Sequence, residues 1–351
     1  MNNSVRKIIK SVVIKGCKIF GVNNIFYKLN RRRKKIIAYH NVLPDNYFKD
    51  VINLEYSIKK SEFIRHLEII KRRFDIGLDL YNADEVTITF DDGYLNQYLI
   101  ASEILDKYGI KAYFFYSGDL LEDRDILSID RIQYWLDYVK EGTYFNKKYN
   151  LELSVSDKNS RDSCWVKIQN LIGNKVSFDE VCNILNEMYS FEDININEDF
   201  YKLRFTPIKK AQLEIMKLRG HKIGAHSASH NILSNMNEDE LENDINKCRE
   251  LLDKGIYNTK TFCYPFGSED EVSEDVIKCV EKNVFKDSLS FMSSKLSKLR
   301  YFKYFIPRIT LPNTDNDDHI DFILSGTYYF MKNFRLFPKI VSKGDVGINY
   351  E

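Results

Sequence analysis

Acidic residues are missing from the start of the chain: none precedes Asp45, although all 351 residues together carry a formal net charge of only +1. A one-sided positive field favours anionic partners such as lipid head groups, nucleic acid or an acidic polymer. No recognisable nucleic-acid-binding module accompanies it, so a nucleic-acid partner is not expected. The basic residues of this stretch are Arg6, Lys7, Lys10, Lys15, Lys18, Lys28 and the run 31–35.

Long apolar runs are also missing. No segment approaches the roughly 18 apolar residues of a transmembrane helix, and Lys15 interrupts the run 11–14 before it resembles the core of a secretory signal. We therefore expect a cytoplasmic protein. The pattern of residues 1–35 instead predicts a basic amphipathic helix. Such a helix could lie on an anionic membrane surface or dock on the protein's own core, and the sequence favours neither alternative.

Paired cysteine motifs are absent. The six cysteines are scattered and none forms a C-x-x-C pair, so we interpret them as reduced thiols, although an even count keeps disulfides open. A chain of this length needs no disulfide to fold, because it can bury a large core in one α/β domain or two smaller ones.

The chain does contain alternating strand and helix patterns. Short apolar runs at 36–40, 86–90 and 111–116 predict strands, and the segments 61–73 and 96–108 between them predict helices. Strand–helix–strand order implies parallel pairing. The rhythm resumes after residue 205, with predicted helices at 208–219, 238–253 and 272–281 and predicted strands at 221–225, 261–264 and within 302–310.

Residues 119–205 interrupt this rhythm with a more charged, helical pattern. We therefore predict a distorted (β/α) barrel made of residues 36–118 and 206–312, with a largely helical insertion at 119–205. Residues 1–35 and 313–351 form the two extensions. In such barrels chemistry lies at the carboxyl ends of the strands.

Polar residues follow four of the predicted strands: His40, the pair Asp91-Asp92, the His226/His230 pair and the segment 264–267. Each alone has a plain structural interpretation, because an Asp-Asp-Gly is usually a turn and a single histidine usually a hydrogen-bonding residue. Histidines four residues apart share one face of a helical turn. Together, one carboxylate and two imidazoles make a common catalytic zinc shell, which leaves the second carboxylate to act as a base.

Three motifs in this order resemble the polysaccharide deacetylase family, the NodB-homology group also called carbohydrate esterase family 4. They are TFDDGY at 89–94, YGIKAYFF at 108–115 and GHKIGAHSASH at 220–230, and the resemblance spans 36–115 and 205–310. It implies that Asp91 is the general base and that Asp92, His226 and His230 bind the metal. It also implies that the CYPFG motif at 263–267 supplies the substrate-binding residues Tyr264, Pro265 and Phe266, with the Phe266 N–H facing the oxyanion.

Two departures from the family pattern shift roles to other residues. No Leu-x-x-x-His motif follows residue 310, so the resemblance to circularly permuted members assigns the general acid to His40. The arginine that often orients the base is replaced by Cys263, and Arg308 is our candidate substitute. The tryptophan that usually accompanies the acid histidine is not identifiable.

The resemblance implies a metal-dependent hydrolase that removes acetyl groups, N-acetyl foremost, from a polysaccharide or a glycan precursor. Zinc fits the donor set first, with cobalt, nickel and iron as alternatives. De-O-acetylation of a sugar ester, or sugar binding by a catalytically degenerate member, are the competing interpretations. Without an export signal, we expect a role in building a surface glycan, in the cytoplasm or peripherally on its membrane.

Overall fold

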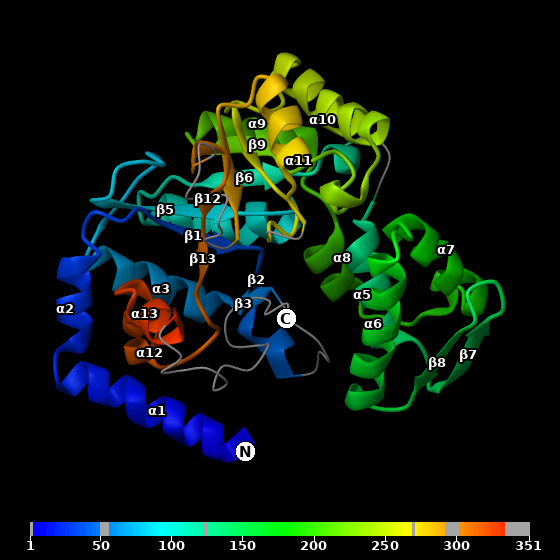
Figure 1. The fold of residues 1–351 in the computed structure, drawn as a ribbon, viewed down its shortest axis with the longest axis horizontal. Coiled ribbons are helices and arrows are strands. Elements are labelled where there is room, and N and C mark those ends of the chain that lie inside the picture. The colour runs from blue at the N-terminus through cyan, green and yellow to red at the C-terminus, as the bar shows by residue number, and fades with distance from the viewer. Residues whose placement is uncertain (1–2, 50–55, 122–124, 269–270, 292–301, 334–351) are drawn as a thin grey trace.

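The computed structural model describes residues 3–49, 56–121, 125–268, 271–291 and 302–333. Part of the predicted C-terminal extension, residues 334–351, therefore lies outside the described residues. Barrel strands, insertion and terminal helices occupy separate regions of the molecule (Figure 1).

A nearly closed barrel of parallel strands forms the centre of the structure, which confirms the predicted fold class. Its strand order is β12-β11-β10-β9-β6-β5-β1-β13, with β4 also pairing with β5. The two ends of this path, β12 and β13, are separated in sequence only by Arg308, so one short segment joins both edges of the sheet. The strands are β1 (Lys35–Tyr39), β4 (Asp75–Ile76), β5 (Glu85–Phe90), β6 (Tyr113–Tyr116), β9 (Lys222–Ala225), β10 (Thr261–Cys263), β11 (Asp287–Ser290), β12 (Ile306–Pro307) and β13 (Ile309–Thr310).

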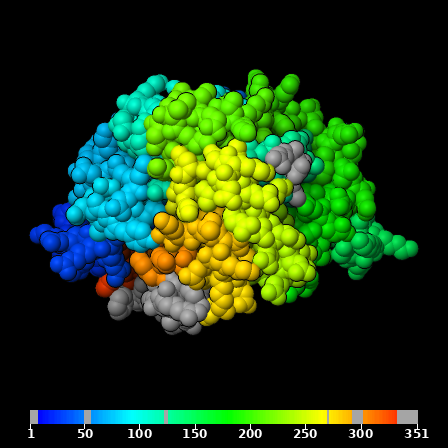
Figure 2. Space-filling view, turned by 90° about the horizontal axis from the view of Figure 1, so that it is seen from above, coloured from blue at the N-terminus to red at the C-terminus, as the bar shows by residue number. Residues whose placement is uncertain are grey.

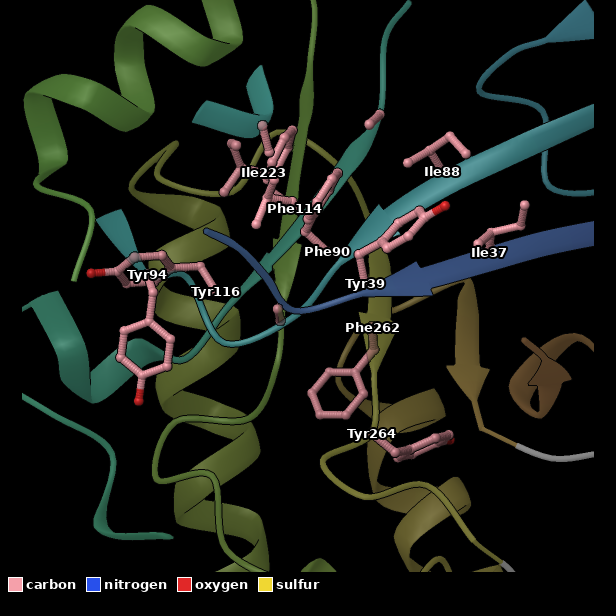
Figure 3. Close-up of a cluster of buried hydrophobic side chains, with 14 of the residues drawn as sticks. Ile37, Tyr39, Ile88, Phe90, Tyr94, Phe114, Tyr116, Ile223, Phe262 and Tyr264 are labelled. Carbon is pink, nitrogen blue, oxygen red and sulfur yellow. The ribbon is translucent and has the colours of Figure 1, made fainter. Parts of the chain in front are cut away.

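Strands β1, β5 and β6 form where the sequence has short, mainly apolar runs, as expected for parallel strands covered on both faces. Their side chains build the main core, in which Phe90 and Phe114 stack with ring centroids 4.8 Å apart. Tyr39 packs on the other side of Phe90 at 5.6 Å, and Figure 3 shows this aromatic cluster. The packed interior fixes the strand ends, and therefore the side chains that follow them.

Helices cover the outside of the barrel. They are α3 (Lys60–Lys71), a π-helical turn (Gln97–Ser102) that runs into α4 (Glu103–Lys107), α9 (Lys210–Leu218), α10 (Glu238–Asp253) and α11 (Glu274–Lys282). The start of α10 is fixed by a capping box in which Asn237 and Glu240 each accept the other's backbone N–H. Two short strands, β2 (Asn41–Leu43) and β3 (Ser57–Lys59), pair beside the barrel.

The segment between β6 and β9 contributes no barrel strand and has its own core around Trp135, Ile168 and Leu185. It contains α5 (Ser128–Tyr138), α6 (Lys158–Gly173), α7 (Phe178–Met188) and α8 (Glu198–Phe205). It also contains an antiparallel hairpin, β7 (Gly142–Asn146) with β8 (Leu151–Val155), which the sequence analysis did not predict. The signal was present in the sequence, because Leu151, Leu153 and Val155 alternate with polar residues along β8, with the period of two that a half-buried strand requires.

The terminal helices pack together on α3, at the opposite end of the molecule from the insertion (Figures 1 and 2). They are α1 (Asn3–Ile19), α2 (Val22–Leu29), α12 (Asp317–Leu324) and α13 (Thr327–Asn333). Ile14 and Cys17 of α1 are buried, so one face of the predicted amphipathic helix does dock on the protein's own core. Within the described part of the chain, none of the helices combines the length and the hydrophobicity needed to span a bilayer.

Candidate metal and catalytic centre

The carboxyl ends of the barrel strands bring the predicted site residues together. His40 follows β1 and the pair Asp91-Asp92 follows β5, and the register pairs Tyr39 with Phe90, so His40 and Asp91 lie side by side. His226 directly follows β9. Arg308 enters from the segment that joins the two edges of the sheet.

Asp92, His226 and His230 converge on one point. The Oδ1 atom of Asp92 lies 3.5 Å from Nε2 of His226 and 3.2 Å from Nε2 of His230. All three side chains are buried, and one ligand atom from each lies within 4.8 Å of the others. Burial raises the pKa of Asp92, but hydrogen bonds with His226 and His230 outweigh it and hold that pKa well below its usual range.

The backbone sets the tautomer of His226. Its Nδ1 lies 2.8 Å from the carbonyl oxygen of Cys263, which can only accept, so Nδ1 carries the hydrogen. Nε2 is then the ring nitrogen that faces Asp92 and is left to bind a cation. A histidine that donates its second ring nitrogen to a backbone carbonyl is the usual arrangement of a metal ligand. An anion and two imidazoles in a buried site thus fit a divalent cation.

A second group, Asp91, His226 and Cys263, also has ligand atoms close enough to share a cation. Two of its ligand atoms are less available to a cation. Both oxygens of Asp91 already accept hydrogen bonds from Arg308. Burial raises the pKa of the Cys263 thiol well above its usual value, so the sulfur keeps its proton. The Asp92 group is therefore the better metal site.

Unusual backbone conformations gather around this centre. Eight described non-glycine residues have positive φ, and five of them border the site: Tyr56 (60°), Asp92 (78°), Ser227 (57°), His230 (58°) and Phe266 (61°). Each such conformation costs on the order of 1–3 kcal/mol, and they concentrate at functional sites. The expectation that the two histidines share a helical turn is wrong. Residues 226–230 form an irregular loop, because Ser227 and His230 have left-handed backbone conformations that a helix cannot contain.

Asp244 of α10 holds this loop in place. Its carboxylate accepts hydrogen bonds from the N–H groups of Ala228 (2.8 Å) and Ser229 (2.9 Å) and from the Ser229 hydroxyl (2.6 Å). The sequence analysis missed this residue. A signal existed, since Asp244 occupies the buried face of α10 beside Leu241 and Ile245, where a carboxylate needs a specific partner.

Arg308 and Asp91 form a fully buried, two-pronged ion pair. Nη1 and Nη2 of Arg308 each lie 2.7 Å from a different carboxylate oxygen of Asp91, and Nη1 also lies 3.1 Å from the Thr89 hydroxyl. Burial raises the pKa of Asp91, but the Arg308 charge outweighs it and the pKa is lowered. Arg308 thus stands where the sequence analysis placed a substitute for the missing arginine, and the Cys263 thiol lies 3.5 Å from the same carboxylate.

His40 is enclosed by aromatic rings. Its Nε2 lies 3.7 Å from Oδ2 of Asp91, and its ring stacks on Phe291 at 5.6 Å and tilts against Tyr56 at 5.0 Å. Phe291 also lies beneath the Arg308 guanidinium, 4.5 Å away. Burial lowers the pKa of His40, although the negative charges of Asp92 and Asp91 act to raise it. Phe291 and Tyr56 therefore fill the place for which the sequence analysis found no aromatic partner.

The three predicted substrate-binding residues differ in their environments. The Tyr264 side chain is fully buried and its hydroxyl donates to the Tyr304 carbonyl, so it packs in the core and exposes no group to a ligand. Pro265 accepts a turn hydrogen bond from Gly267. Phe266 packs its ring 5.3 Å from His230, and no described residue accepts a hydrogen bond from its N–H.

A pocket of about 240 Å³ lies beside this centre, between the insertion and the barrel. Phe178 of α7 forms part of its wall and stacks on Phe266 at 5.6 Å. Asn231 and Asn235 line the barrel side, and Ser177 and Lys175 line the insertion side. The pocket thus offers both hydrogen-bond donors and acceptors, and Asn231, which directly follows His230, connects it to the metal triad.

Comparison with known proteins agrees with this geometry. The family profile described as polysaccharide deacetylase matches residues 172–284, which include both metal-site histidines. No curated protein sequence matches the chain. Two solved structures have the same fold with a TM-score of 0.50. The Streptococcus pyogenes deacetylase PplD in complex with acetate is 14% identical, over 82% of this chain and 96% of that one. BC0361, a polysaccharide deacetylase from Bacillus cereus, is 12% identical, over 83% and 68%.

The profile match covers the later part of the insertion and the barrel strands β9 and β10, whereas the two aspartates follow β5, outside the matched residues. Residues 172–284 thus match the polysaccharide deacetylase family, and the chain shares its fold with solved polysaccharide deacetylases.

Proposed function

We propose that this chain is a metal-dependent deacetylase that removes N-acetyl groups from a glycan or a glycan precursor during surface polysaccharide synthesis. One observation carries the proposal: of two adjacent buried aspartates, Asp91 is neutralised by Arg308, whereas Asp92 faces two imidazoles. That division leaves one carboxylate to bind a cation and the other to exchange a proton.

Asp92, His226 and His230 would hold the metal, and zinc is the first choice for one oxygen and two nitrogen donors. When bound, a divalent cation supplies a water of lowered pKa and polarises the acetyl carbonyl. The strained loop and Asp244 would keep the two imidazoles in place before the cation binds.

Asp91 would accept the proton of the attacking water. Arg308 donates to both carboxylate oxygens and the Cys263 thiol donates to Oδ1 as well, which leaves the second lone pair of Oδ2 to take up a proton. The ion pair orients the carboxylate and keeps it ionised near neutral pH.

His40 would donate a proton to the departing amine, since it lies beside Asp91 at the end of the neighbouring strand. The Phe266 N–H, which has no acceptor among the described residues, would donate to the developing oxyanion. The pocket beside Phe266 would receive neighbouring units of the glycan, because its amides, its hydroxyl, the Lys175 ammonium and the Glu240 carboxylate can all hydrogen-bond to a polyhydroxylated chain.

Acetate release from matched N-acetylated and O-acetylated oligosaccharides tests the proposal. Purified protein with zinc should release acetate from N-acetyl substrates faster than from their O-acetyl counterparts. Preference for the esters would instead identify a de-O-acetylase with the same machinery. Absence of release from both sets, at full metal occupancy, would contradict the enzymatic function for those glycans.

Replacing one ligand should show which of the two candidate residue groups binds the metal. His230→Ala is expected to lose bound zinc, measured by elemental analysis after dialysis, because His230 belongs only to the Asp92 group. Cys263→Ala is the matched control and should keep stoichiometric zinc. The reverse pattern would place the metal between Asp91 and Cys263.

Replacing the acid should slow turnover without removing the metal. His40→Gln is expected to lower kcat for an N-acetyl sugar by about 10²- to 10⁴-fold, the usual contribution of a general acid. An activated phenyl acetate needs no protonation of its leaving group, so its hydrolysis should be much less affected. Equal losses on both substrates would show that His40 is not the acid.

A further inference from the structure

Large apolar side chains are exposed on the two N-terminal helices. Of sixteen exposed large hydrophobic residues in the described part of the chain, six lie between residues 8 and 29, so the exposure is concentrated rather than scattered. The exposed fractions are 63% for Ile8, 64% for Val12, 78% for Ile19, 81% for Phe20, 56% for Ile25 and 69% for Leu29.

The exposed residues of α1 form one stripe. At 3.6 residues per turn, Ile8, Val12 and Ile19 fall within an arc of roughly 40°. The buried residues Ile14 and Cys17 lie on the other side of the helix and pack toward α12. The helix therefore has two apolar faces, and docking on the protein's own core accounts for only one of them.

Exposed positive charge lies on the same helix as the stripe and on the segment that follows it in the chain. Lys15, Lys28 and the three arginines 31–33 are exposed, and no acidic residue precedes Asp45. The acidic residues of α12 against which α1 packs are already paired with cations: Asp317 with Arg65, Asp318 with Lys18 and Asp321 with Arg73. Among the described residues of α1, α2 and α12, the exposed charge that remains after these pairs is therefore basic.

We propose that α1 and α2 bind the surface of an anionic lipid bilayer, with the stripe of Ile8, Val12 and Ile19 inserted at the level of the head groups. A helix with an apolar stripe and exposed positive charge suits such an interface. A second copy of the chain fits less well, because a symmetric contact would bring the same lysines and arginines together. The proposal is independent of the deacetylase chemistry.

Flotation of the purified full chain with lipid vesicles tests this surface. Binding to vesicles that contain phosphatidylglycerol should exceed binding to pure phosphatidylcholine and should weaken as salt is added. Ile8→Ser/Val12→Ser/Ile19→Ser should lower the apparent affinity at least tenfold. These side chains are exposed, so the thermal midpoint should stay near that of the wild type.

A matched control removes apolar side chains elsewhere. Ile215→Ser/Leu218→Ser changes two exposed residues of α9 and should leave vesicle binding unchanged. Equal loss in both variants, or no binding of the wild type to anionic vesicles, would overturn the proposal. Concentration-dependent dimerisation that the triple variant abolishes, without vesicle binding, would assign the stripe to a second copy instead.

Discussion

Arg308→Met is expected to lower the free energy of unfolding by about 3–5 kcal/mol, the usual cost of leaving one member of a buried ion pair without its partner. Asp91 is fully enclosed, and Arg308 supplies the two 2.7 Å hydrogen bonds that offset its burial. Chemical denaturation of wild type and variant measures the difference. Arg131→Met is the control, because its ion pair with Asp125 is largely exposed and should be worth less than about 1 kcal/mol.

The same ion pair makes the free energy of unfolding depend on pH. Arg308 lowers the pKa of Asp91 in the folded state, below the value of about 3.9 for an unfolded aspartate. The stabilisation is therefore present above about pH 4 and is lost as the pH falls through the folded-state pKa. Combining Arg308→Met with Asp91→Asn should recover part of the lost stability. If Arg308→Met alone were as stable as Arg131→Met, the charge of Asp91 would have to be neutralised by another group.

Asp91→Asn is expected to reduce kcat for acetate release by about 10²- to 10⁴-fold, the usual contribution of a general base. The amide keeps the size of the side chain but cannot take up a proton at neutral pH. KM should change little, because the lost interaction belongs to the transition state. Zinc content should be retained, since Asp92 is a separate ligand.

Stability must be measured alongside activity for this variant, because the amide leaves the Arg308 charge without a counter-ion. Assays well below the melting temperature separate the two effects. Acetate release at the wild-type rate by folded Asp91→Asn would contradict the role of Asp91 as base. A loss of zinc together with activity would show instead that Asp91 binds the metal.

Much of this centre could be predicted because parallel strands end at one rim. The apolar runs of β1 and β5 identified both strands, and their adjacency places His40 next to Asp91. Arg308 was predicted as the partner of Asp91 from a short strand-like segment, and the structure places it there. The role of each of these residues, and the circular permutation that suggested His40, stay predictions.

The parts that escaped prediction depend on contacts between distant segments. Strand β11 reads Asp-Ser-Leu-Ser, with too little apolar pattern to be recognised, so Phe291 at its end was not connected with His40. The four-residue spacing of His226 and His230 suggested a helix, whereas Ser227 and His230 are left-handed and Asp244 holds Ala228 and Ser229 between them in a loop. Spacing alone does not reveal a conformation that a buried carboxylate on another helix stabilises.

The central claim, a deacetylase that depends on one bound metal, is tested most directly by titrating metal-free protein with zinc and measuring acetate release from an N-acetylated oligosaccharide at each point. Acetate release should be absent without metal and should rise in proportion to added zinc until one equivalent is bound. Acetate release that is independent of zinc, or absent at one bound equivalent with every N-acetylated and O-acetylated substrate, would contradict the account.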